Sequence, residues 1–266
     1  MKDASASVKT VRTGKTGKTG FTGRVAGLLQ AIRKGLGRWS GPVHPLLEEN
    51  YMLFAEFDQE KPIEEYSFVV LDTELTGLSP SRDEIVSIGA VRVSGLSINP
   101  SDTLHVMVRP HGAMHKPATL VHRITPETVA DKPPIEDVLP ELLRFCNGSL
   151  IVGHHVGLDM AFLSRATRRH LGGSIATPCI DTMRLAQAWE QERWEASFDP
   201  FQSNISYNLR DLATYYGLPR FQEHDALQDA LQAAYLFVYL VRKMRGGSIR
   251  TLKDLFMAGR SWRWYM

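Results

Sequence analysis

Cysteine is scarce in this sequence, with two residues, Cys146 and Cys179, in a chain of 266. Two distant cysteines without a CxxC spacing indicate neither a disulfide framework nor a zinc site. Apolar runs are also short, because no stretch approaches the ~18 consecutive apolar residues of a membrane-spanning helix. The first residues lack the apolar core of a secretory signal. We therefore expect a cytoplasmic protein without stable membrane insertion.

Charge is distributed unevenly along the chain, although the net charge is only +2. Residues 1–40 hold nine Lys or Arg and one Asp, a local net charge of +8, which leaves −6 for the remainder. This basic, Gly/Thr-rich segment offers little apolar surface to bury, so it should not fold by itself. We predict that residues 1–62 form a leader that is largely flexible.

An amphipathic helix is predicted within the leader, at residues 24–39, where apolar side chains recur at helical spacing beside basic ones. Such a helix could contact an anionic membrane surface, bind nucleic acid or belong to a transit peptide. It could equally pack on its own domain. The leader alone does not decide between these roles.

Strand and helix patterns fill residues 63–245 and predict one α/β domain. Three strands at short spacing are typical of an antiparallel meander. Helices then alternate with two shorter strands, which favours a mixed five-stranded sheet flanked by helices. The predicted strands are 67–72, 84–93, 104–110, 149–154 and 178–182, and the predicted helices are 134–146, 158–171, 208–216 and 226–244. Residues 246–266 form a short, basic and aromatic C-terminal tail.

Two acids, Asp72 and Glu74, end the first predicted strand. Side chains two residues apart on a strand project from the same face, so these carboxylates can meet at one point. Close carboxylates repel each other unless a cation lies between them, and hard oxygen ligands suit Mg²⁺ or Mn²⁺. The pair therefore predicts half of a metal site, although acids are also common where a strand enters solvent.

Further acids stand where apolar elements begin. Asp159 follows a predicted strand and lies in the first turn of a helix, a position that also favours a carboxylate on electrostatic grounds alone. His224 precedes the last long helix, and Asp229 lies in its opening turns. Each residue is a weak signal singly, but their order along the chain is more specific.

This order resembles that of the 3′-to-5′ exonucleases with four acids and a histidine, the DEDDh type, which include the proofreading epsilon subunit of bacterial DNA polymerase III. The matching motifs are VVLDTELTG, VGHHVGLDMAFL and HDALQDA, supported by HRITPE, IDTMRLA and NLRDLATYYGLP. The resemblance implies a ribonuclease H-like fold and two Mg²⁺ or Mn²⁺ ions. It makes His224 the general base and implies four metal ligands: Asp72, Glu74, Asp159 and Asp229.

Substrate contacts are implied by the same resemblance, at positions near the 3′ end held by relatives. Leu78 would pack against the terminal base. This chain departs from the common pattern at several of these positions, such as Leu75 after the second acid and the pair His154–His155. The implied substrate-binding residues are Leu75, Thr76, Leu78, His122 and His155.

The function implied is hydrolysis of DNA from the 3′ end, in proofreading or repair, with release of nucleoside 5′-monophosphates. An exoribonuclease that trims RNA is the alternative, since the two differ in contacts to the 2′ position. A non-catalytic nucleic-acid-binding module should have lost an acid, whereas all four acids stand here. A membrane or partner adaptor built on the leader is a further alternative.

The expected partners are single-stranded or frayed 3′ ends of DNA, or of RNA, together with a polymerase or a sliding clamp. The sequence DLF at residues 254–256 resembles part of the clamp-binding peptide but lacks its glutamine. Trp262, Trp264 and Tyr265 in the tail could stack on single-stranded bases or dock the tail on the domain.

Overall fold

The computed structural model describes residues 42–55, 57–197 and 205–259, all within one compact unit, Ser40–Met266. The predicted helix at 24–39 and the aromatic residues at 262–265 lie outside these ranges. Within the described ranges, every helix is either too short or too polar to span a lipid bilayer.

A single five-stranded sheet organises the described residues, in the order β3-β2-β1-β4-β5. β1 pairs antiparallel with β2, and β2 with β3, which confirms the predicted meander. β4 pairs parallel with β1, and β5 with β4. The predicted mixed α/β sheet is therefore confirmed. The strands are β1 (Ser67–Leu75), β2 (Ile85–Ser94), β3 (Ser97–Met107), β4 (Ser149–Gly153) and β5 (Cys179–Asp181).

The helices include all four that the periodicity predicts, namely α5 (Ile135–Cys146), α6 (Gly157–His170), α8 (Leu209–Tyr215) and α9 (Ala226–Met244). Others have no counterpart in the prediction. These are α2 (Pro45–Ala55), the 3₁₀ turn η1 (Ile63–Glu65), α3 (Lys116–His122), α4 (Pro126–Val129), α7 (Thr182–Ser197) and α10 (Leu252–Gly259).

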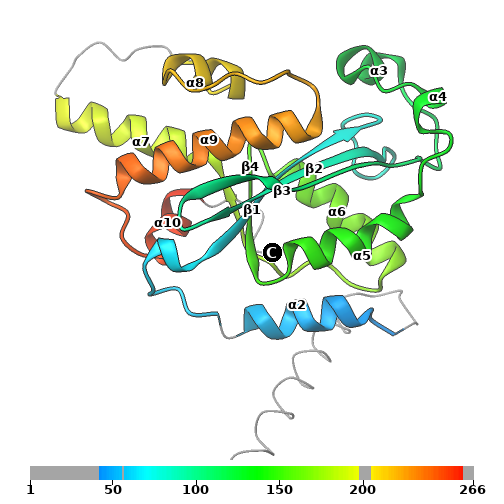
Figure 1. Ribbon diagram of the computed structural model, residues 1–266, viewed down its shortest axis with the longest axis horizontal. Helices are drawn as coiled ribbons and strands as arrows, with labels where there is room; N and C mark the ends of the chain where they lie inside the picture. Colours follow the sequence, from blue (N-terminus) through cyan, green and yellow to red (C-terminus); the bar gives the residue numbers. More distant parts are fainter. Residues whose placement is uncertain (1–41, 56, 198–204, 260–266) are drawn as a thin grey trace, which may run out of the picture. The chain divides into compact units, whose positions relative to one another are not determined.

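The two faces of the sheet are covered by different helices. α9 lies along one face, across β1 and β2, with α7 and α8 packed against it, whereas α5 and α6 lie on the other (Figure 1). Phe68 and Val70 of β1 point to the α9 face, and the Phe68 ring lies 5.0 Å from that of Phe237, centroid to centroid. Alternation along the strand turns Val69 and Leu71 to the other face, where both are buried.

Two helices extend this fold beyond the predicted limits of 63–245. In α2, Leu47 is fully buried, and the Asn50 side chain donates to the Thr177 hydroxyl at 2.7 Å and accepts from the Ala176 N–H at 2.8 Å. In α10, Leu252 and Leu255 are fully buried in the same core as α9. The part of the predicted flexible leader that forms α2 is thus a packed helix, as are residues 252–259 of the predicted tail.

The clamp-like sequence at residues 254–256 lies within α10. Its Leu255 is fully buried, and Asp254 accepts hydrogen bonds from the backbone N–H groups of Arg250 and Thr251. A clamp-binding peptide must present its apolar residue to the partner, whereas Leu255 faces its own core. The segment as folded here is a structural part of the domain.

Candidate active site

The acids of β1 lie at the edge of the sheet where the parallel strands β1, β4 and β5 end. Asp72 and Glu74 share one face of β1 and are partly exposed, while Thr73 between them is buried. Because parallel strands end at the same edge, the residues that follow β4 and those that end β5 lie beside β1. This edge therefore gathers Asp72, Glu74, Asp159 and Asp181.

Gly89 of β2 allows the start of α9 to lie at the same edge of the sheet as the acids of β1. Gly89 of β2 pairs with Asp72, and a Cβ at Gly89 would lie only 2.1 Å from the backbone carbon of Ala226, the first residue of α9. The start of α9 therefore rests directly on the β2 backbone. Asp229, in the first turn of α9, consequently lies beside the acids of β1.

Three carboxylates converge at this point, because Asp72, Glu74 and Asp229 each offer an oxygen within 4.8 Å of the others. Asp159 is buried beside these three carboxylates. Its Oδ1 accepts a hydrogen bond of 2.5 Å from the Thr73 hydroxyl, which links the helix start to the strand. β1, α6 and α9 thus place the four predicted acids at one site.

Electrostatic repulsion accompanies this convergence. Burial raises the pKa of Asp72 well above its usual range, and the charges of Asp159, Asp229 and Glu74 raise it further. Burial and the neighbouring acids raise the pKa of Glu74 to about 7, and burial raises the pKa of Asp159 to about 7 and that of Asp229 to about 6. Hard divalent cations would relieve this repulsion, and clustered carboxylate oxygens are the ligands that Mg²⁺ and Mn²⁺ prefer.

His224 stands at the start of α9 with an exposed side chain and a left-handed backbone, φ 61°. Its backbone N–H donates to Asp229 Oδ2 at 2.8 Å, so the turn that presents the imidazole also orients the carboxylate. The intervening Asp225 caps α9, accepting from the backbone N–H groups of Leu227 and Gln228. His224 therefore lies beside the acids with its imidazole accessible.

His122 is buried at the end of α3 and lines a cavity of about 150 Å³ that His224 also lines. Its Nδ1 accepts from the Ile124 N–H at 3.0 Å, while its buried Nε2 makes no hydrogen bond within the described residues. Burial lowers the pKa of His122, an effect that the Leu75 backbone partly opposes. The neutral ring with Nδ1 accepting carries its proton on Nε2.

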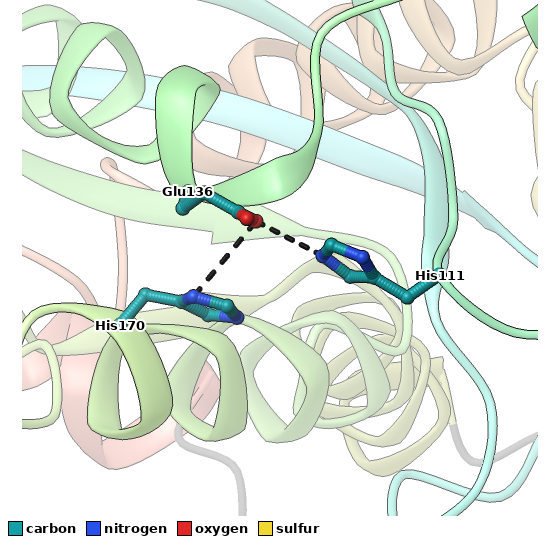
Figure 2. Close-up of side chains that lie close together, drawn as sticks. All are labelled: His111, Glu136 and His170. Carbon is teal, nitrogen blue, oxygen red and sulfur yellow. Dashed lines mark hydrogen bonds and ion pairs between the residues drawn. The ribbon is translucent and has the colours of Figure 1, made fainter. Parts of the chain in front are cut away.

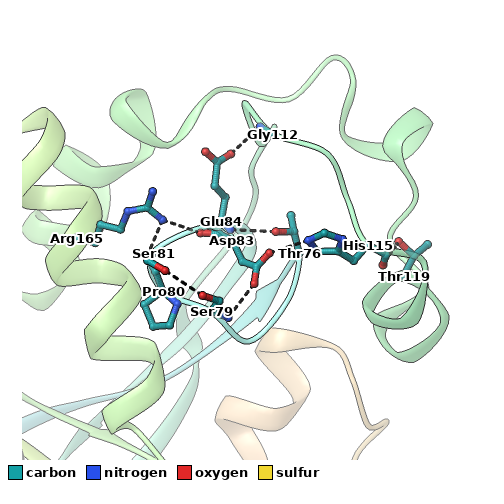
Figure 3. A network of polar contacts seen from close by, with 10 residues as sticks. All are labelled: Thr76, Ser79, Pro80, Ser81, Asp83, Glu84, Gly112, His115, Thr119 and Arg165. Atoms are coloured by element: carbon teal, nitrogen blue, oxygen red, sulfur yellow. Dashed lines mark hydrogen bonds and ion pairs between the residues drawn. The ribbon is translucent and has the colours of Figure 1, made fainter.

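The loop between β1 and β2 (residues 76–84, the β1–β2 loop) presents Leu78, whose side chain is 77% exposed. The loop is fastened internally, since Thr76 and Glu84 exchange backbone and hydroxyl hydrogen bonds and Asp83 accepts from the Ser79 N–H (Figure 3). Thr76 and Leu75 are themselves buried. Of the predicted substrate residues in this region, Leu78 thus has the accessible side chain.

The two adjacent histidines after β4 have different surroundings. The His154 ring is held between the Thr182 hydroxyl, 2.9 Å from Nδ1, and the Tyr207 carbonyl, 3.0 Å from Nε2. Burial lowers the pKa of His154 to about 4, so the ring is neutral and Nε2 donates to the carbonyl. The His155 side chain is exposed, whereas its backbone N–H donates to Asp181 Oδ1 at 3.1 Å.

Thr73, His154 and Asp181 position the site but are missing from the predicted set. Asp181 is 4% exposed, and its Oδ1 accepts from the His155 N–H, in the turn that leads into α6, and from the Met183 N–H at 3.0 Å, at the start of α7. Asp181 lies within the last predicted strand, 178–182, and in the family-like stretch IDTMRLA, which was a signal for it. Nothing in the sequence pattern distinguishes the Thr73 hydroxyl from any other strand threonine.

Comparison with known proteins identifies the family to which this arrangement belongs. The sequence profile described as exonuclease matches residues 69–237, which is more than half of the chain and includes all five predicted catalytic residues. The chain belongs to this exonuclease family. The resemblance drawn from the three motifs is thereby confirmed.

Relatives of the exonuclease family include proteins of DNA replication. The chain is 35% identical over 189 residues to a DNA polymerase III PolC-type protein of Thermotoga maritima, covering 71% of this chain and 13% of that protein. It is 29% identical over 178 residues to the DNA polymerase III subunit epsilon of Aquifex aeolicus, covering 67% of this chain and 82% of the subunit. The chain therefore spans a small part of the PolC-type relatives.

Solved structures of exonucleases share the fold. Exonuclease X in complex with 5′ overhanging duplex DNA is 28% identical, with a TM-score of 0.53 that covers 72% of this chain and 99% of that one. Escherichia coli Exonuclease I in complex with a dT13 oligonucleotide is 16% identical, with a TM-score of 0.58 over 68% and 42% of the two chains. The predicted ribonuclease H-like architecture is confirmed.

Proposed function

We propose that this chain is a metal-dependent exonuclease that removes nucleoside 5′-monophosphates from the 3′ end of DNA. The observation that carries the proposal is the convergence of Asp72, Glu74 and Asp229 with Asp159 beside an accessible histidine, His224. The family to which the chain belongs supports the reaction class. DNA is favoured as substrate because the relatives named above are DNA polymerase III proteins.

The acids would hold the divalent cations. Asp72, Glu74, Asp159 and Asp229 offer carboxylates whose pKa values are raised, chiefly by burial, so bound cations would stabilise their charged forms. Two bound Mg²⁺ or Mn²⁺ ions would supply stabilisation of the charge on the entering and leaving oxygens of the phosphodiester. Thr73 would keep Asp159 in place by its hydroxyl.

His224 is proposed as the general base that accepts the proton of the attacking water. An imidazole suits this role because histidine exchanges protons near neutral pH. The hydrogen bond from its backbone to Asp229 fixes the turn that carries the ring. The exposed position of the side chain leaves it free to approach the water when a strand is bound.

The predicted substrate residues would receive the 3′ nucleotide on the side of the acids where α3 lies. Leu78 offers an exposed apolar side chain on a fastened loop for the terminal base. His122 offers a buried N–H donor in the cavity that it shares with His224. Leu75 and Thr76 would act by shaping the backbone between Glu74 and Leu78, and His155 would contribute an exposed ring after β4.

The proposed activity is tested with 5′-labelled single strands of DNA and RNA of one sequence, incubated with Mg²⁺ or Mn²⁺ or with EDTA. We expect a ladder that shortens from the 3′ end, faster on DNA, and that is absent with EDTA. Faster shortening of the RNA strand would instead assign the alternative exoribonuclease function. No metal-dependent shortening of either strand would overturn the catalytic proposal in favour of a binding module.

A pair of matched variants ties the activity to the site. Asp159→Asn should lower the rate by about a hundredfold or more, because it removes a metal ligand. Asp137→Asn makes the same change in the first turn of α5, where the side chain is exposed and away from the acids. Equal activity of the two variants would refute the assignment of Asp159.

A polymerase partner is proposed from the names of the relatives alone. Co-elution of the chain with a replicative polymerase catalytic chain on gel filtration tests it. Separate elution of the two proteins at concentrations well above those in a cell would contradict it.

A further inference from the structure

A second cluster of metal-binding side chains lies away from the acids, where three segments meet. His111 follows β3, Glu136 lies in the first turn of α5, and His170 is the last residue of α6. Figure 2 shows the two rings on either side of the carboxylate. Glu136 Oε2 lies 3.1 Å from His111 Nε2 and 3.8 Å from His170 Nδ1.

The geometry of the cluster is close to that of a three-ligand metal site. The three ligand atoms all lie within 4.8 Å of one another. A tetrahedral zinc ion with ligands at 2.0–2.1 Å requires ligand atoms about 3.3 Å apart, so closing the site needs shifts of roughly 1 Å in the side chains. The rings are stacked at 15° with centroids 6.2 Å apart, so both nitrogens can turn to one point beside the carboxylate.

We propose that His111, Glu136 and His170 bind a divalent cation of the zinc class at a site separate from the catalytic acids. Two imidazoles and one carboxylate are a ligand set typical of Zn²⁺, with the fourth position left to water. Mg²⁺ prefers oxygen ligands, so it should favour the acids instead. The chemistry of the two ligand sets thus predicts different metals for the two sites.

The separation of the two sites follows from α6. Asp159 lies in its first turn and His170 is its last residue. With a rise of 1.5 Å per residue, the two positions are about 16 Å apart along the helix axis. One ion therefore cannot be shared between the cluster and the catalytic acids.

The surroundings of the cluster admit a cation. Glu136 and His170 are partly buried and His111 is exposed, so an ion can enter from solvent. Glu84 lies nearby and adds negative charge, which the neighbouring Arg169 opposes.

A bound ion would fasten the segment between β3 and α3 (residues 108–115, the β3–α3 segment) to α5 and α6. The backbone N–H groups of His111 and Gly112 already donate to Glu84 Oε2, at 2.5 and 3.1 Å. Further along the segment, His115 Nε2 lies 3.0 Å from Asp83 Oδ1 (Figure 3). Glu84 and Asp83 belong to the β1–β2 loop, so the ion would also steady the loop that carries Leu78.

Zinc binding to the untagged full chain, stripped with EDTA and dialysed into excess Mg²⁺, tests the proposal. Isothermal titration should detect one Zn²⁺ site, and His170→Ala and Glu136→Gln should each weaken it by at least about tenfold. Co²⁺ in place of Zn²⁺ should give the strong visible absorption of a tetrahedral site. Zn²⁺ should raise the melting temperature of the wild type, and the rise should be lost in both variants.

Two controls distinguish this site from the acids and from general effects of substitution. Glu141→Gln makes the same change at an exposed position of α5 and should leave zinc binding unchanged. Asp72→Asn should keep the zinc site, since its ligands are elsewhere. Unchanged zinc affinity in His170→Ala and Glu136→Gln, or loss of all zinc binding in Asp72→Asn, would overturn the proposal.

Discussion

At the scale of single residues, the four acids oppose the stability of the fold that holds them. Their raised pKa values mean that the metal-free folded state binds protons more tightly at these positions than the unfolded chain does. For such acids, stability is fully present below the unfolded pKa, about 4, and is lost as the pH rises through the folded value. The metal-free protein is therefore strained by its own carboxylates at neutral pH.

Asp72→Asn should consequently stabilise the metal-free protein while removing its response to metal. In EDTA at pH 8 the variant should melt a few degrees above the wild type, because one of the mutually repelling, partly buried charges is gone. The gain should shrink as the pH falls through 7 and 6 and vanish below about pH 4, where the wild-type acids are protonated in both states. Thermal melting between pH 4 and pH 8 measures this.

Thermal melting in Mg²⁺ instead of EDTA is the complementary measurement. Mg²⁺ should raise the melting temperature of the wild type by mass action and leave Asp72→Asn almost unmoved. A variant that is less stable than the wild type at pH 8 in EDTA would show that Asp72 makes favourable contacts instead of suffering repulsion.

The sequence motifs identify the charged residues of the site but not the side chains that hold them in position. Asp72, Glu74, Asp159, Asp229 and His224 carry unusual chemistry for their positions, so the motifs make them visible. Thr73 acts through a hydrogen bond to Asp159, and the His154 ring is held by Thr182 and Tyr207, all residues far along the chain. Such bonds depend on three-dimensional placement, which strand and helix periodicity does not report.

At the scale of elements, the contact between β2 and the start of α9 determines whether the acids meet. Gly89 permits that contact, since any Cβ there would overlap the Ala226 backbone. Asp229 and His224 both depend on it, because the turn that holds them begins α9.

Gly89→Ala adds only one methyl group but should therefore lower the exonuclease rate strongly. We expect a loss of about 1–3 kcal/mol in the free energy of unfolding from overpacking, and a much larger relative loss of exonuclease rate as α9 is displaced. Denaturant unfolding and the digestion assay measure the two effects. Gly246→Ala, where nothing lies within 4 Å, is the matched control. Full activity in Gly89→Ala would contradict this role of the contact.

Elements with a strong hydrophobic periodicity were predictable from the sequence, whereas elements with a weak amphipathic pattern were not. The α9 residues 226–244 were predicted to the residue because a long apolar face is buried on the sheet. α4 is only four residues long, and the apolar side chains of α3 at Leu120 and Val121 are exposed, so neither helix has a buried apolar face for a periodic pattern to report. β3 begins at Ser97, earlier than predicted, because its first half is polar and exposed and is recognised as a strand only through pairing with β2.

At the scale of the whole molecule, the domain is larger than the family motifs indicate. α2 precedes the motif region and α10 follows it, yet both bury leucines completely. The composition places α2 in the basic leader, although its own sequence, PLLEENYMLFA, contains no basic residue and is largely apolar. The boundary of the basic segment and the boundary of the fold are therefore different positions.

Leu47→Ala should lower the free energy of unfolding by about 2–5 kcal/mol if α2 is an integral part of the domain. Leu53→Ala, in the same helix but 40% exposed, should cost much less. Denaturant unfolding of the two variants measures the difference. Equal and small effects would show that α2 is only loosely attached, as a flexible leader would be.

The central claim, digestion from a free 3′ end, is tested most directly by comparing a 5′-labelled linear single strand of DNA with a covalently closed circle of the same sequence. With Mg²⁺ the linear strand should shorten from its 3′ end and the circle should stay intact, and His224→Ala should slow the shortening by about 10²–10⁴-fold. Cleavage of the circle, or an intact linear strand, would contradict the account.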